Sequence, residues 1–299
     1  MMNDESMQLI WDALQRPDND IPWSGLEALA DAVVADSDLI DELFRAYDEA
    51  REAVLDRACY IHLYVPAILA LAAPKLDEQR RREVGSSLIA RLIEAGEQDD
   101  HLMMEVLAAV CGAMGPVILP RVFDVVTEDT VSSGTRSHLW GLTKLAVKSD
   151  QTLRSEAVAA CAGLLERVAR EEVECEMGVE AAWTLVSLGG VEHIGLLRRL
   201  ELQSRWTLVY TDYSGARQAL EEHRESPFSL ELWELPVRDW FEPRWQRTQD
   251  WLATRDSVTR NWEALQATYT AEPFAVAPIP IVARTPRSAR KNSHYAAIR

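Results

Sequence analysis

The chain has 299 residues, of which 47% are hydrophobic and 26% charged, as is typical of a globular protein with a substantial core. Its net charge is −17, and because the last 26 residues (274–299) carry five basic and no acidic side chains, residues 1–273 carry −22. This balance argues against general nucleic-acid binding by the body, and the lack of an apolar run of about 18 residues argues against a membrane span.

Helical periodicity dominates the first 225 residues, with breakers at helix-length intervals. A helix is expected after Ser37, which is a favourable N-cap, and the following acidic residues suit the positive end of the helix dipole. A second helix should end at Ala72–Ala73, before Pro74, and another should span Leu76–Ala95 and close at Gly96. These features predict an all-α body.

Acidic side chains are concentrated in the first of these helices. Residues 1–60 hold 15 acidic and 4 basic side chains. We expect the acidic surface of this N-terminal stretch to dock a basic partner, although a solvated outer face would show the same composition. The candidate contacts are Asp31, Asp38, Asp41 and Glu42.

One tight group contains metal-ligand residue types. Asp100, His101 and Glu105 follow one another closely, and the last two share a helix face. The alternative is a helix N-terminus that uses acidic residues as caps, with a helix running to Met114 and ending at Gly115. No cofactor is predicted.

Two segments of the chain resemble each other. AAVCGAMGPVILPRVF, from Ala108, and AAWTLVSLGGVEHIGLLRRL, from Ala181, each combine small residues, an apolar stripe, a hydrophobe–Gly ending and a second amphipathic helix. Looser versions recur at intervals of 31 to 43 residues, in the range of helix-pair repeats. The pattern resembles HEAT-type repeats of the armadillo-like group, although the spacing is uneven and the regular Asp and Arg positions are missing.

That resemblance implies a right-handed α-α superhelix of about five or six helix pairs over residues 1–225. It also implies a scaffolding or adaptor role with no shared catalytic residues. Stacked helix pairs present long surfaces that recognise proteins or peptides.

Five of the ten tryptophans lie in residues 226–271, interrupted by prolines. We expect this region to cap the last apolar face of the repeats. An interface hot spot is the alternative, because Trp and Arg are favoured there. Its candidate residues are Trp240, Arg244, Trp245 and Trp251.

Residues 272–299 contain four prolines and should form a basic, non-helical tail. Such a tail suits an acidic partner, RNA, or the acidic body of the same or another copy. The oligomeric state is left open.

Several functional signatures are missing from the sequence. It has no phosphate-binding loop, GxSxG or HExxH motif, and its four separated cysteines indicate reduced thiols of a cytoplasmic protein.

We therefore expect a non-enzymatic interaction module with a basic protein partner. The alternatives are an acidic immunity or inhibitor protein that neutralises a cationic effector, and an enzyme with carboxylates and histidines dispersed between helices. A helical-repeat DNA glycosylase is disfavoured by the sign of the charge.

Overall fold

The computed structural model describes residues 21–52, 61–128, 130–204, 210–224, 236–247 and 250. In these residues all regular structure is helical and no strand occurs, which confirms the all-α class. Met1–Thr248 belong to one compact unit and Gln249–Arg299 to a second, of which only Asp250 is among the described residues. The predicted tail at 272–299 lies outside them.

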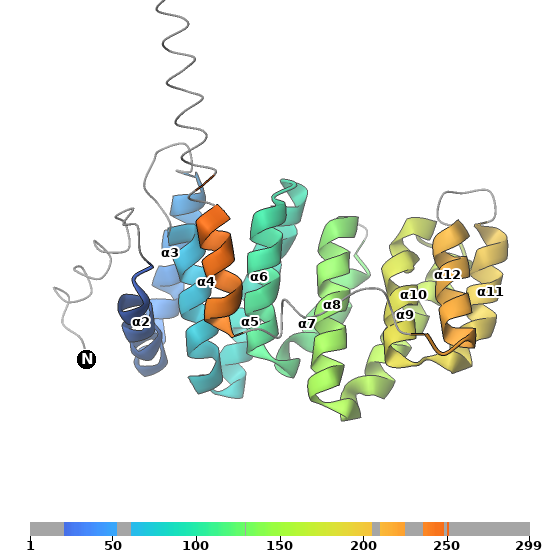
Figure 1. The fold of residues 1–299 in the computed structure, drawn as a ribbon, viewed down its shortest axis with the longest axis horizontal. Coiled ribbons are helices and arrows are strands. Elements are labelled where there is room, and N and C mark those ends of the chain that lie inside the picture. Colours follow the sequence, from blue (N-terminus) through green and yellow to red (C-terminus); the bar gives the residue numbers. More distant parts are fainter. Residues whose placement is uncertain are drawn as a thin grey trace, which may run out of the picture. The chain divides into compact units, whose positions relative to one another are not determined.

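The described part of the first unit is built from helices of 8 to 20 residues (Figure 1). They are α2 (Trp23–Ala35), α3 (Asp38–Glu52), α4 (Ile61–Ala72), α5 (Glu78–Glu97), α6 (His101–Met114), α7 (Leu119–Val126), α8 (Ser133–Ser149), α9 (Arg154–Ala169), α10 (Val179–Leu188), α11 (Ile194–Gln203) and α12 (Tyr210–Glu221). A further helix covers residues 237–247. The 3-10 turns at the junctions are η1 (Ala73–Lys75), η2 (Pro116–Ile118), η3 (Gln151–Leu153), η4 (Cys175–Gly178) and η5 (Val191–His193).

Local sequence explains most of the helix ends. The Asp100 carboxylate accepts from the Met103 amide at 3.1 Å, so this residue is the N-cap of α6. The predicted stops at Gly115 and Gly189 are confirmed, with φ of +77° and +65°, a region that glycine enters without strain. Helix α5 begins two residues later than expected because Asp77 is its N-cap. It ends at Glu97, so the expected stop at Gly96 is wrong: Gly96 lies inside the helix, and Gln98 is the C-cap.

The helices pack in a regular alternation. Each of α3, α5, α7, α9 and α11 packs against the even-numbered helix that follows it. The even-numbered helices α2 to α12 also pack against one another in succession. Figure 1 shows the numbered helices following one another in chain order. Each even-numbered helix from α4 to α12 therefore packs both against its odd-numbered partner and against at least one other even-numbered helix.

Arginines from neighbouring helices cap several helix C-termini. Arg154 of α9 donates to the carbonyl oxygens of Leu188 and Gly189 at 2.7 and 2.8 Å, which closes α10. In the same way Arg80 donates to Val34, the penultimate residue of α2, at 3.1 Å. A guanidinium satisfies the last carbonyl groups of a helix and complements the negative end of its dipole. These contacts tie successive helices together through polar groups as well as through the core.

Helix 237–247 packs against α2, α4 and α6, at the end of the unit where the chain begins (Figure 1). The Trp-rich segment was expected to cap the last helices of the body. Its described part, helix 237–247, packs instead against the first helices, because its aromatic and arginine side chains contact α2, α4 and α6. The rest of the expected 226–271 cap, including Trp251, lies outside the described residues.

No single described helix is long and apolar enough to cross a membrane. The consecutive segments His101–Met114 and Pro116–Val126 reach the required length and composition only together, and they are bent by 107°.

Candidate functional site

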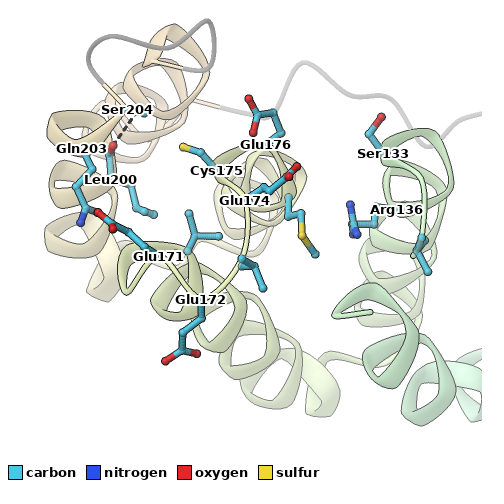
Figure 2. A pocket seen from close by; sticks show the side chains of 14 residues that line it. Ser133, Arg136, Glu171, Glu172, Glu174, Cys175, Glu176, Leu200, Gln203 and Ser204 are labelled. Carbon is cyan, nitrogen blue, oxygen red and sulfur yellow. Dashed lines mark hydrogen bonds between the residues drawn. The ribbon is translucent and has the colours of Figure 1, made fainter. Parts of the chain in front are cut away.

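A hollow of about 810 Å³ opens between α8, the segment after α9, and α11 (Figure 2). Helix α9 ends at Ala169, whose carbonyl oxygen accepts from the Gln203 side-chain amide of α11 at 3.0 Å. The chain then turns through Glu171, whose φ is +60°, and continues into η4. Val131, Met177 and Leu200 supply buried apolar surface to the lining.

Four glutamates line this hollow and give it a strongly acidic character. Glu171, Glu172, Glu174 and Glu176 all have exposed side chains. Glu172 forms ion pairs with Arg170 at 3.2 Å and with Arg167 at 3.9 Å. The other three glutamates make no ion pair with any residue in the described ranges. The hollow therefore presents carboxylates that remain free to accept hydrogen bonds from a cation.

One cation, Arg136 of α8, stands on the opposite wall (Figure 2). Its side chain is buried, and its guanidinium donates to the carbonyl oxygens of Val126 at 3.2 Å and Glu128 at 2.8 Å. These carbonyls lie at and just beyond the C-terminus of α7. Arg136 thus holds α7 against α8.

Cys175 is the one lining residue with a nucleophilic sulfur. Burial raises the pKa of its thiol, and the neighbouring Glu176 raises it further, while hydrogen bonds with Tyr213 and Ser204 oppose the change. The group is a neutral thiol at pH 7, which makes it a weak nucleophile. No histidine lines the hollow, so its described walls lack a cysteine–histidine or serine–histidine pair.

The predicted acidic contacts of the N-terminal region lie on α2 and α3. Asp31 forms an ion pair with Lys75 of η1, and Glu42 pairs with Arg45 at 3.5 Å. Asp38 and Asp41 lie in the first turn of α3, where they complement the helix dipole. The structure does not gather these four residues into one pocket, and part of their charge is already neutralised.

Asp48, in the same acidic stretch, has a structural role. Both of its carboxylate oxygens accept from Arg91 of α5, at 2.9 and 2.6 Å, and the guanidinium carbon lies 4.2 Å from the centroid of the Phe44 ring. This bidentate and cation–π arrangement ties α3 to α5.

The candidate metal ligands do not converge. Asp100 caps α6, His101 Nε2 lies 3.2 Å from an oxygen of Asp99, and Glu105 pairs with Arg244 at 3.1 Å. Within the residues that the structure describes, no group of three or more His, Cys, Asp or Glu side chains is placed to hold a metal ion. The alternative interpretation, a helix N-terminus capped by an acidic residue, is confirmed for Asp100.

Three of the four predicted aromatic and arginine contacts come together. Trp240, Arg244 and Trp245 share the buried face of helix 237–247, while Trp251 is outside the described residues.

Sequence reasoning missed the glutamates of the hollow, although the stretch REEVECEMGVE places five acidic residues between positions 171 and 180. An acidic run in a connection between two apolar helices was the available signal.

No family model, curated protein or solved structure matches this chain. The HEAT-like resemblance therefore stands on the sequence pattern alone.

Proposed function

We propose that this chain is a HEAT-like helical-repeat module that binds a cationic segment of a protein partner in its acidic hollow. The alternation of helix pairs, with the even-numbered helices packed in succession, supports a stack of helix pairs, and the HEAT-like resemblance implies that the stack is a right-handed superhelix. Such stacks recognise extended segments of other proteins along one surface.

The observation that carries the proposal is the pairing of free carboxylates with apolar surface in one hollow. Glu174 and Glu176 are exposed beside buried Met177, and neither forms an ion pair in the described part of the chain. Lysine and arginine side chains combine an aliphatic stem with a charged end, so they match both halves of this surface. A neutral or acidic segment would leave the carboxylates without partners.

A protein that neutralises a cationic effector would use the same surface, because acidic charge accelerates the capture of a basic partner. An enzyme that combines carboxylates with a histidine is less well supported, since the walls of the hollow supply carboxylates but neither a histidine nor an ionised thiol.

The test is binding of a fluorescent nona-arginine peptide to the full chain, followed by anisotropy. We expect the double variant Glu174→Gln/Glu176→Gln to bind about 3- to 10-fold more weakly than the parent, because each exposed ion pair contributes about 0.2–1 kcal/mol. The loss should shrink at high salt, where such pairs are screened.

The matched control is Glu83→Gln/Glu192→Gln, which removes the same charge from exposed positions on α5 and η5. It should bind the peptide nearly as well as the parent. Equal losses in the two double variants would show that only the overall charge matters, and the assignment to the hollow would then be rejected.

A further inference from the structure

Residues 237–247 form an amphipathic helix with a narrow buried face. Val237 is half-buried, and Trp240, Phe241, Arg244 and Trp245 are buried. Their spacing of i, i+3, i+4, i+7 and i+8 is the pattern by which a helix lies in a groove. The opposite side of the helix is exposed at Asp239, Glu242, Pro243, Gln246 and Arg247.

The receiving surface is aromatic and is built from two even-numbered helices. The Phe241 ring meets Trp23 of α2 edge to face, with centroids 5.5 Å apart, and lies 6.2 Å from the ring of Tyr64 on α4. The indole N–H of Trp245 donates to the Tyr64 hydroxyl at 3.3 Å. Phe241 and Trp245 therefore share one receiving residue, Tyr64.

Ion pairs hold the helix at two positions that are six residues apart. Arg238 pairs with Glu27 of α2 at 2.6 Å and lies over the Trp23 ring at 4.9 Å. Arg244 is 2% exposed and pairs with Glu105 of α6 at 3.1 Å. A buried guanidinium with a carboxylate partner fixes the register of the helix, because any slip would leave the charge without that partner.

The helix is weak on its own. It has eleven residues, and isolated helices shorter than about 12–15 residues are marginal in water. Pro243 lies inside it and cannot donate the amide hydrogen bond that the helix needs at that position. Docking against α2, α4 and α6 therefore supplies the stability that the segment lacks.

We propose that the face formed by α2, α4 and α6 is a helix-binding groove, and that residues 237–247 are its internal occupant, which leaves while the body stays folded. The partner that replaces it is an amphipathic helix with the same chemistry, namely bulky aromatics about one turn apart and an arginine that pairs with Glu105. Until displaced, the internal helix keeps the groove closed to that partner. This proposal does not depend on the acidic hollow.

Hydrogen exchange of the unmodified full chain is the first test. Amides of residues 240–247 should exchange at least tenfold faster than the core amides of α4 and α6, because the helix opens without global unfolding. Equal protection in the three helices would make residues 237–247 an integral part of the core and would overturn the proposal.

The second test adds the occupant in trans. A labelled peptide of residues 233–250 is titrated into the full-length parent and into Trp240→Ala/Trp245→Ala, in which the internal helix has lost its anchors. The variant should bind at least tenfold more tightly, because the parent's own segment competes at a high effective concentration. The control Asp239→Asn/Glu242→Gln changes only the exposed side and should behave like the parent.

The register is tested with a peptide in which the arginine is replaced, Arg244→Ala. It should bind the emptied variant at least tenfold more weakly than the unmodified peptide. The proposal fails if neither peptide binds the emptied variant while its circular dichroism remains that of the parent. If that variant loses its helical body, the helix is a structural part of the core and the proposal also fails.

Discussion

Two cysteine thiols, Cys111 on α6 and Cys161 on α9, lie in the helical core with 0% of their surface exposed. Burial raises the pKa of Cys111 from 9.0 to about 12, and it raises the pKa of Cys161 as well. Both groups are neutral, reduced thiols that fill space between helices. This agrees with the interpretation of the cysteines from sequence; Cys59 lies outside the described residues.

The Cys111 thiol predicts a specific dependence of stability on pH. Above pH 9 the unfolded chain loses this proton while the folded chain keeps it, so the thiol's contribution to stability is present below pH 9 and is lost as pH rises. The difference in unfolding free energy between the parent and Cys111→Ala should therefore fall by about 1.4 kcal/mol per pH unit above 9. Urea unfolding of both proteins at pH 8, 9.5 and 10.5 measures it. A constant difference would contradict the burial of this thiol.

Among the helices, a glycine can permit a close approach between two elements. A Cβ atom on Gly85 of α5 would lie 2.2 Å from the Ile118 Cγ2 atom of η2, which is far inside a normal contact. Gly163 of α9 is exposed and has no atom within 4 Å of the same position. The first glycine permits packing between elements, and the second has no such role.

These two glycines give a matched pair of substitutions. Gly85→Ala should lower the unfolding free energy by about 1–3 kcal/mol, because the packed η2 turn must move. Gly163→Ala should raise it by about 0.5–1 kcal/mol, because alanine restricts the unfolded chain and favours the helix. Urea denaturation of both variants tests the packing of α5 on η2. Stabilisation by both would mean that the contact is not formed in solution.

At the scale of the whole molecule, charge is the dominant surface property. The net charge of −17 includes a body of −22, and like charges repel one another in the compact state. Ion pairs such as Arg91 with Asp48 offset part of this repulsion at particular contacts between helices.

Moderate salt should therefore stabilise the protein. Raising sodium chloride from 20 to 200 mM shortens the Debye length from about 20 Å to about 7 Å and screens the repulsion between distant carboxylates. The midpoint of urea unfolding should rise, by an amount that corresponds to about 1 kcal/mol. Urea unfolding of the full chain at pH 7, at both salt concentrations, measures this midpoint. A midpoint that falls with salt would indicate that attractive ion pairs outweigh the repulsion.

Much of the local structure was predictable from single residues. The helix that ends at Met114 and the one that ends at Leu188 were expected from their hydrophobe–Gly pairs, and both ends are confirmed. These ends depend on a backbone geometry with positive φ, which glycine adopts without strain. Contacts between distant residues were not predictable: Glu105 was considered as a metal ligand, and its partner Arg244 lies 139 positions further along the chain.

The helical class, the acidic charge and the ends of several helices follow from the amino-acid sequence. Apolar periodicity and capping residues act within one or two helical turns, and net charge depends on composition, so none of them requires knowledge of which helices meet. The fold in three dimensions was needed to place the glutamates after α9 in one hollow and to bring helix 237–247 back to α2, α4 and α6. Both depend on which faces approach across the fold, and a pattern of residues along one helix does not specify the helix that will cover it.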